Sequence, residues 1–254
     1  MQSSLDKLVT SLTNKRHIWI LTGAGISQPS GIPTYRDHKG QWQASQPIQH
    51  QEFINQPVAR QRYWARSAVG WRYMEKAQPN AAHHAITRLQ QKGLISQIVT
   101  QNVDRLHSEA GATDVIDLHG RIDQVICLDC GISSPRSDHQ LRLLNSNPQL
   151  TAFTAKDLPD GDAHLEGFDT SQVSVPACSH CQGMLMPDVV FFGGTVPKKR
   201  VEQAIDKLSL SDAVLVVGTS LTVYSGFSFV RQAHQQLIPL YAINQCTVRG
   251  EDLF

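Results

Sequence analysis

The feature that most constrains this fold is an apolar run near the start of the chain that ends in a glycine-rich turn. Residues 18–21 are all apolar, and Gly23 and Gly25 follow at once. Such a run predicts a strand that is buried on both faces. Glycines after it let the backbone approach a ligand, and the N–H groups of a helix start attract negative charge. The stretch therefore predicts a pyrophosphate site, although Gln28 replaces the third glycine of G-x-G-x-x-G.

The residues after this turn allow two interpretations. Residues 30–33 predict the end of a short helix, and Tyr35 and Arg36 then fall in a predicted loop that Trp42 closes. The loop is either an ordinary surface loop with a chance aromatic residue, or a lid with Tyr35 and Arg36 facing a ligand.

Strand and helix patterns alternate along the rest of the chain. Strands are expected at residues 94–99, 115–118, 213–217 and 238–243, and helices at 5–12, 57–76, 81–91, 103–110, 197–208 and 225–236. This βαβ alternation predicts an α/β fold with a doubly wound parallel sheet. Ligands of such sheets gather at the carboxyl ends of the strands. Residues 23–27, residues 101–104 and His119 each follow a predicted strand, so we expect them to converge.

Four of the five cysteines form two CxxC pairs, Cys127 with Cys130 and Cys178 with Cys181. Two such pairs predict a closed tetrahedral site for one structural zinc, with a redox dithiol as the alternative. The long separation between the pairs implies an inserted segment. Cys246 is left over and is interpreted as a small residue near a strand end.

Composition and charge argue against several classes of function. The 254 residues carry a formal net charge of +1, with 41% hydrophobic and 18% charged residues and no long basic or acidic run. Binding to nucleic acid or to a membrane surface is therefore not expected as the main function. No apolar run approaches the roughly 20 residues of a membrane-spanning helix. Because no signal-peptide core precedes residue 18, we expect a cytoplasmic protein.

Taken together and in order, the motifs of this chain resemble those of the sirtuin family. They are GAGISQPSGIPTYR, TQNVDRLH, LHG, the two CxxC pairs, PDVVFFG, VVGTSL and AIN, and they extend from residue 18 to residue 244. Residues 47–50, 62–71 and 159–162 further resemble the class II branch, which includes the mitochondrial lipoamidase-type sirtuin. The resemblance implies an NAD-dependent protein-lysine deacylase.

The resemblance also implies two domains. A Rossmann-like NAD-binding domain is expected from residues 1–120 together with 187–254. A smaller zinc-binding domain is expected from residues 121–186, with a long class II-type loop at 145–172. We expect a monomer whose partners are acylated-lysine proteins, without nucleic acid or membrane partners.

In the reaction that the resemblance implies, the acyl oxygen attacks the anomeric carbon of the nicotinamide ribose and nicotinamide leaves. His119 is then the general base on a ribose hydroxyl, and water completes the formation of free lysine and O-acyl-ADP-ribose. An imidazole suits this role because it titrates near neutral pH. Asn102 would position the nicotinamide ribose and a water, and Asp104 would hold the nicotinamide amide.

The same resemblance implies contacts for NAD and for the substrate peptide. The expected NAD contacts are Gly23, Ala24, Gly25, Ser27, Ile32, Pro33, Tyr35, Arg36, Trp42, Gln101, Asn102, Val103, Asp104, Gly218, Thr219, Ser220, Asn244 and Gln245. The peptide is expected to add as a strand between two segments. Their residues are Val190, Phe191, Phe192 and Gly193 in one, and Val223, Tyr224, Ser225 and Gly226 in the other.

Tyr63 and Arg66 form a Y-x-x-R pair, whose spacing places both on one side of a helix. In the desuccinylase branch of the family, this spacing captures an acyl carboxylate. We hypothesise that Arg66 lets the enzyme accept acidic or bulky acyl chains through charge-assisted hydrogen bonds. The alternative is that Arg66 pairs with a neighbouring loop.

Two departures from the family pattern affect these expectations. Gly194 stands where an acidic residue usually follows Phe-Gly, and the sequence ends at Phe254, where the resembled family continues. Altered target preference, and either weaker NAD binding or lower stability, are the expected effects. Mono-ADP-ribosyl transfer or NAD hydrolysis in the same pocket, and a non-catalytic NAD-sensing module, are the alternative functions.

Overall fold

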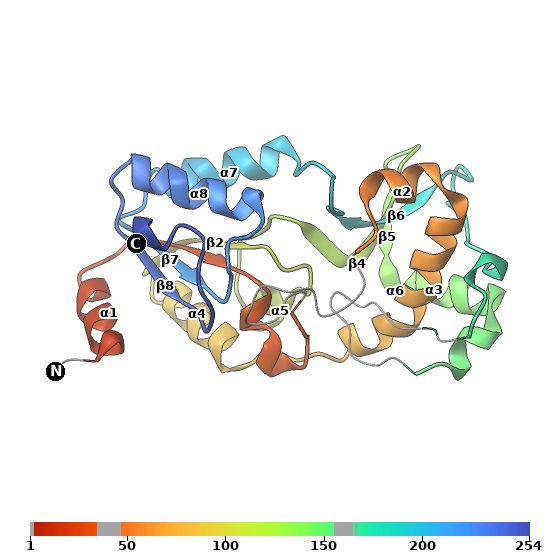
Figure 1. Ribbon diagram of the computed structural model, residues 1–254, viewed down its shortest axis with the longest axis horizontal. Coiled ribbons are helices and arrows are strands. Elements are labelled where there is room, and N and C mark those ends of the chain that lie inside the picture. Colours follow the sequence, from red (N-terminus) through yellow and green to blue (C-terminus); the bar gives the residue numbers. More distant parts are fainter. Residues whose placement is uncertain (1–2, 35–46, 155–164, 166) are drawn as a thin grey trace.

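A computed structural model of the chain describes residues 3–34, 47–154, 165 and 167–254 (Figure 1). Its larger sheet has five strands in the order β3-β2-β1-β7-β8. These are β1 (Ile18–Thr22), β2 (Ile95–Thr100), β3 (Val115–Asp117), β7 (Ala213–Val217) and β8 (Leu240–Ile243). All neighbouring strands pair in parallel, so the predicted doubly wound parallel sheet is confirmed.

Helices cover both faces of this sheet, and the side chains of β1 alternate between them. Trp19 and Leu21 pack with α7 (Lys198–Leu208) and α8 (Tyr224–Gln235) on one face. Ile18 and Ile20 pack with α4 (Ala81–Gln91) on the other. Every residue of β1 is buried. Each fully buried apolar side chain contributes about 1.5–3 kcal/mol, so the apolar run that opened the sequence forms the centre of the core.

The second sheet has three antiparallel strands in the order β5-β4-β6. They are β4 (Gly120–Cys127), β5 (Ser133–Pro135) and β6 (Leu185–Val189). Its apolar side chains pack with α2 (His50–Asn55), α3 (Pro57–Met74) and α6 (Arg136–Ser146), which lie at the same end of the molecule in Figure 1. β6 crosses the domain boundary expected at residues 186 and 187, and that division stays a prediction.

Within residues 145–172, the described parts form short helical turns that lie on α3. Pro148–Ala152 and Thr170–Gln172 are 3-10 turns. From α3, Arg72 donates to the carbonyls of Leu150 and Phe153, and Gln61 donates to those of Ser171 and Val173. These contacts attach both ends of the segment to the same helix.

Two helices differ most from their predictions, whereas the other predicted helices agree with the structure to within two residues at each end. The helix expected after Gly25 is a pair of 3-10 turns, Ala24–Ile26 and Gln28–Ser30, which the left-handed Gly31 ends at a φ of 85°. The helix expected at residues 103–110 is α5 (Leu106–Glu109). It starts late because Arg105 is left-handed, with a φ of 68°, and the Asp104 carboxylate accepts the N–H of Leu106 at 3.0 Å. Because the turn after β1 leads into 3-10 turns, it has no α-helix N-terminus that could attract a phosphate.

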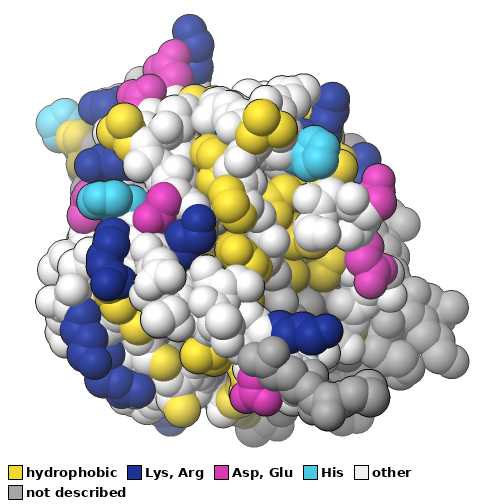
Figure 2. Space-filling view, turned by 90° about the vertical axis from the view of Figure 1, so that its left-hand side faces the viewer, with side chains coloured by type: hydrophobic (Ala, Val, Ile, Leu, Met, Phe, Trp, Pro, Cys, Tyr) yellow, Lys and Arg dark blue, Asp and Glu magenta, His cyan; other side chains and the backbone are white. Residues whose placement is uncertain are grey.

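The N-terminal helix α1 (Ser4–Leu12) is capped but buries none of its residues. The Ser3 hydroxyl accepts the N–H of Asp6, and Leu5 remains 65% exposed. Figure 2 looks onto the end of the molecule where α1, β8 and the C-terminus lie, and apolar side chains gather in a strip along this face. In the described part of the chain, no helix combines the length and apolarity needed to cross a membrane.

Candidate active site and metal centre

The carboxyl ends of the parallel strands bring the predicted site residues to one edge of the larger sheet. Gly23 follows β1, Gln101 follows β2, and His119 lies two residues after the end of β3. Gly218 follows β7, and Asn244 follows β8. The strand order changes direction between β1 and β7, which is where ligands of such sheets bind.

The glycines of two turns pack against each other at this point. The N–H of Gly25 donates to the carbonyl of Gly218 at 2.8 Å, and a Cβ on Gly25 would lie 2.8 Å from that oxygen. A Cβ on Gly23 would lie 2.5 Å from the Cβ of Thr219. Gly218 has a φ of +63°, a conformation that favours glycine. These glycines therefore let two turns form one continuous wall, in addition to any room they leave for a ligand.

Three predicted residues form one hydrogen-bonded chain beside this wall. The Asn102 amide donates to the carbonyl of Gly23 at 3.1 Å and to the hydroxyl of Ser27 at 3.0 Å. The Ser27 hydroxyl donates to the Asp104 carboxylate at 2.6 Å. Asn102 and Ser27 are buried, so these bonds fix the orientation of both side chains.

A second contact crosses from β2 to β7. The Gln101 side-chain amide donates to the Thr219 hydroxyl at 3.0 Å and to the carbonyl of Thr22 at 3.3 Å. This amide thus holds the ends of β1, β2 and β7 together at the edge where ligands of such sheets bind.

His119 has a hydrogen-bond partner at each ring nitrogen. Nδ1 lies 3.0 Å from the carbonyl oxygen of Gln101, and Nε2 lies 2.8 Å from the hydroxyl of Ser225. A carbonyl can only accept, so in the neutral ring Nδ1 carries the proton and Nε2 accepts from Ser225. Burial lowers the pKa of His119 to about 4, the bond to Gln101 opposes this, and the Arg200 charge lowers the pKa further. The ring is neutral at pH 7, and its lone pair lies at Nε2, where it accepts from Ser225.

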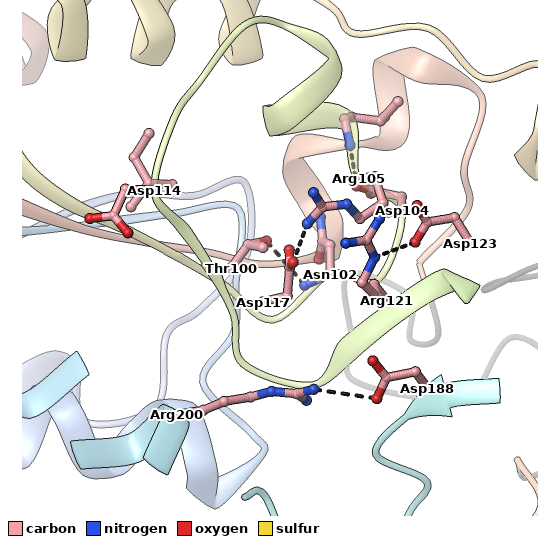
Figure 3. A network of polar contacts seen from close by, with 12 residues as sticks. Thr100, Asn102, Asp104, Arg105, Asp114, Asp117, Arg121, Asp123, Asp188 and Arg200 are labelled. Carbon is pink, nitrogen blue, oxygen red and sulfur yellow. Dashed lines mark hydrogen bonds and ion pairs between the residues drawn. The ribbon is translucent and has the colours of Figure 1, made fainter. Parts of the chain in front are cut away.

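Sequence reasoning missed a buried polar chain beneath Asn102. The Thr22 hydroxyl lies 2.9 Å from Nε2 of His107 and donates to the Thr100 hydroxyl at 2.9 Å. The Thr100 hydroxyl accepts the backbone N–H of Asn102 at 3.1 Å (Figure 3). Burial, followed by the charge of His83, lowers the pKa of His107 to about 3. The sequence signal was a threonine at the end of each of two neighbouring apolar strands.

The segment predicted to bind the peptide lies beside His119. The N–H of Val190 donates to the carbonyl of His119 at 2.7 Å, and the carbonyl of Phe192 accepts the N–H of His50 at 2.8 Å. From the other side, Ser225 at the start of α8 reaches the His119 ring. The sequence predicts a peptide contact for Ser225, and its bond to His119 is a finding of the structure.

Tyr63 on α3 stacks beside this segment. Its ring centroid lies 5.0 Å from that of Phe191 and 5.5 Å from that of Phe53. Arg66 lies one turn further along α3 and is half-buried. Tyr63 of the Y-x-x-R pair therefore borders the predicted peptide segment.

The four cysteines of the CxxC pairs converge in the smaller sheet region. Their sulfur atoms all lie within 4.8 Å of one another, with 3.5 Å between Cys127 and Cys181 and 3.9 Å between Cys130 and Cys178. Tetrahedral zinc with Zn–S bonds of about 2.3 Å separates its sulfur ligands by about 3.8 Å. The donor set therefore fits one structural zinc, as predicted.

Residues 23–225 match the Sir2 family model. The chain belongs to the Sir2 family, the sirtuins. An NAD-dependent protein deacetylase from Bordetella bronchiseptica is 51% identical over 99% of this chain and 92% of its own length. NAD-dependent protein deacetylase 2 from Bradyrhizobium diazoefficiens is 52% identical over 94% of this chain and 87% of its own.

Solved structures agree with this sirtuin assignment. The structure of Sir2Tm bound to a propionylated peptide has a TM-score of 0.76 and 28% identity, and covers 99% of this chain and 90% of its own. A structure of Sir2 bound to acetylated peptide has a TM-score of 0.74 and 27% identity, with the same coverage.

Other predicted site residues of this sirtuin have varied surroundings. Ile32 and Val103 are buried in a cluster with Trp71, while Pro33 is half-buried. The Asn244 amide donates to the carbonyl of Cys246 at 2.8 Å and holds the turn after β8. Outside the described residues lie Tyr35, Arg36, Trp42 and residues 159–162.

Gly194, where the family usually has an acidic residue, lies in a tight turn. Its N–H donates to the carbonyl of Phe191 at 2.9 Å, and a Cβ would lie 2.9 Å from the same oxygen. A larger side chain at this position of the sirtuin would therefore require the turn to shift.

Proposed function

We propose that this sirtuin is an NAD-dependent protein-lysine deacylase that removes acetyl groups and releases nicotinamide and O-acyl-ADP-ribose. The observation that carries the proposal is a neutral His119, held at both nitrogens, at the edge where Asn102 and Asp104 also lie. The relatives named NAD-dependent protein deacetylases support it. When bound, NAD supplies an anomeric carbon with nicotinamide as the leaving group.

The residues of the chain then perform binding, orientation and proton transfer. Asn102 and Asp104 are fixed through Ser27, so their polar groups need no reorganisation when the dinucleotide binds. His119 accepts a proton at Nε2 once the Ser225 hydroxyl turns away. The carbonyl of Gln101 holds Nδ1–H and stabilises the ring as it becomes charged.

The central test is turnover of an acetyl-lysine peptide with NAD, followed by mass spectrometry of the products. We expect O-acetyl-ADP-ribose from the wild type and about a 10²–10⁴-fold lower kcat from His119→Ala, with NAD affinity retained. Undiminished turnover by this variant would exclude the proposed base. ADP-ribosylated protein or free ADP-ribose would instead indicate the transferase or hydrolase, and NAD binding without turnover would indicate a sensing module.

We further propose that Arg66 favours acidic acyl chains, as in the Y-x-x-R pair of the resembled branch. The contact of Tyr63 with Phe191 supports this, because it places the helix that carries Arg66 beside the segment proposed to bind the acyl-lysine peptide. A guanidinium in such a pocket forms charge-assisted bonds to a carboxylate, and an acetyl group offers no such partner.

Rates on acetyl-, succinyl- and hydroxymethylglutaryl-lysine peptides test this selectivity. Arg66→Ala should lower kcat/KM for the acidic acyl groups by about tenfold or more relative to acetyl. Arg62→Ala is the matched control, since Arg62 is exposed on the same helix. Equal selectivity in the wild type and both variants would exclude the role of Arg66.

We also propose that the protein acts in the cytoplasm as a monomer. A reducing compartment keeps the four cysteines available as thiolate ligands. Light scattering of the purified protein tests the monomer, and fractionation of the source cells tests the location.

A further inference from the structure

The two sheets meet at the backbone of His119 and Gly120. Gly120 begins β4 with a φ of +88°, and a Cβ there would overlap the carbonyl oxygen of Asp188. Two residues further along, the N–H of Val190 donates to the carbonyl of His119. The end of β6 is therefore pressed against the residue that we propose as the base.

One ion pair connects this end of β6 to the helix layer of the larger sheet. Nη2 of Arg200 lies 3.3 Å from Oδ1 of Asp188, and their side chains are 27% and 30% exposed. Arg200 belongs to α7, whose Ala204 and Leu208 are fully buried against the larger sheet. Asp188 belongs to β6 of the smaller sheet. Figure 3 shows this pair below the turn between β3 and β4.

The other ion pairs of this region do not join the sheets. Arg105 and Asp117 connect the loop after β2 to β3, within the larger sheet. Arg121 and Asp123 both lie on β4. Among the ion pairs of the described residues, the Arg200 pair is thus the one that bridges the two sheets.

We propose that Arg200 is a positioning residue, which acts through Asp188 to hold residues 190–193 against His119. The inference rests on the proposed function, because it concerns the placement of the substrate strand relative to the base. With Arg200 fixed by α7 and Asp188 fixed by β6, the pair sets how closely the two sheets approach beside the site. Residues 190–193 follow Asp188 directly, so a displacement of Asp188 moves the peptide-binding segment.

The charge of Arg200 has a second effect that can be measured separately. It faces His119 and lowers the pKa of that ring, in addition to burial. Among the described residues, the hydrogen-bond partners of the ring are the carbonyl of Gln101 and the hydroxyl of Ser225. Asp117, whose pKa burial raises to about 6, also faces Arg200. Loss of the Arg200 charge should therefore raise the pKa of His119, whereas a purely structural side chain would leave it unchanged.

The test compares Arg200→Gln with Arg200→Lys, which keeps the charge, and with Lys198→Gln as a control on the exposed side of α7. We expect Arg200→Gln to raise the KM for an acetyl-lysine peptide about tenfold, the change that corresponds to about 1.4 kcal/mol. The KM for NAD should remain unchanged. Arg200→Lys should restore most of the peptide affinity, and Lys198→Gln should match the wild type.

Two measurements without turnover separate this inference from the proposed function. NMR titration of labelled His119 in the NAD-free protein should show a raised pKa in Arg200→Gln and a wild-type pKa in Arg200→Lys. Calorimetry should show weaker peptide binding in Arg200→Gln and in Asp188→Asn, with little further loss in the double variant. A wild type without deacylation would refute the proposed function, yet both measurements would still test Arg200.

The inference is overturned if Arg200→Gln keeps the wild-type peptide affinity and His119 titration, even with a lower melting temperature. Additive losses in the double variant would also overturn it, because the two residues would then act independently. If Arg200→Gln fails to fold, Asp188→Asn breaks the same ion pair, and its peptide affinity is compared with those of the wild type and Arg200→Lys.

Discussion

The two sheets of this sirtuin are each stabilised in a different way. In the five-stranded sheet, apolar side chains on both faces pack against helices, and four of the five residues of β7 are buried. In the three-stranded sheet, β5 has no buried residue, and the four cysteines lie at the end of β4 and in the turns beside it. The first region is stabilised by burial on both faces of its sheet, whereas the second combines a buried cluster on α2, α3 and α6 with a set of four cysteines that fits zinc.

Their contributions to the site differ in the same way. The larger sheet supplies the ends of five strands, where the polar side chains of the site are held by one another. The smaller-sheet region supplies residues 190–193 after β6, where Phe191 packs against the rings of Phe53 on α2 and Tyr63 on α3. A parallel sheet concentrates chemical groups at one edge, and under our proposal the smaller region adds peptide recognition beside that edge.

The largest expected effect follows from removing a zinc ligand in the smaller region. Cys178→Ser should reduce bound zinc from about one per chain to none and unfold this region, because structural zinc contributes about 10–16 kcal/mol to folding. Cys246→Ser is the control, since Cys246 lies outside the cluster. Metal analysis and circular dichroism measure both outcomes, and a folded, zinc-free variant would show that packing alone suffices.

A glycine substitution tests the larger region. Gly218→Ala should lower the free energy of unfolding by about 3 kcal/mol, because it combines a strained positive φ with overlap of the Ile26 backbone. Gly31→Ala should cost only about 1 kcal/mol, since Gly31 has a φ of +85° but open space around it. Urea unfolding measures the difference, and equal losses would mean that the two turns do not pack as tightly as described.

Acid should weaken both regions through one buried histidine in each. Burial lowers the pKa of His107 in the larger region and of His139 in the smaller to about 3, and neighbouring charges lower it further. With a pKa of 6.5 when unfolded, each binds more protons in the unfolded state between pH 6.5 and 3. Stability is therefore complete above pH 6.5 and falls as the pH drops, by about 2 kcal/mol per histidine at pH 5.

Variants assign this acid sensitivity to each region. His107→Gln and His139→Phe should each reduce the loss of unfolding free energy between pH 7.5 and pH 5, as measured by urea unfolding. The same pH dependence in the wild type and both variants would show that other groups cause it.

The smallest effect is expected for an exposed ion pair on α7. Lys198 and Glu202 lie 3.4 Å apart with side chains 90% and 56% exposed. Glu202→Gln should change the free energy of unfolding by less than about 0.5 kcal/mol, because water and salt screen such pairs. A thermal unfolding shift well beyond this range would mean that α7 depends on its surface charges.

Sequence alone predicted most of the fold because local patterns determine it here. The apolar run of β7 and the pattern of α4 gave the same bounds as the structure, because β7 is apolar throughout and α4 is bounded by the Asn80 cap before it and by Gly93 after it. The helix at 103–110 was predicted too long because Asp104 and Arg105 leave the helical conformation for tertiary contacts. Such contacts have no local signature.

The residues of the site were predictable from the sequence, but the hydrogen bonds and ion pairs between them were not. Strand ends and motifs placed His119, Asn102 and Gly218 at one edge of the sheet. The bond between His119 and Ser225 joins residues 106 positions apart, and no periodicity indicates such a partner. The ion pair between Arg200 and Asp188 was not predicted for the same reason, since it depends on how the two sheets are oriented relative to each other.

The packing of Gly25 against Gly218 also has an evolutionary consequence. Neither turn leaves room for a side chain on the other, so a substitution in one can persist only if the other moves with it. The two turns lie far apart in the sequence but should change together or remain fixed together. Across relatives, we therefore expect the residues of the turn after β1 to covary with those of the turn after β7.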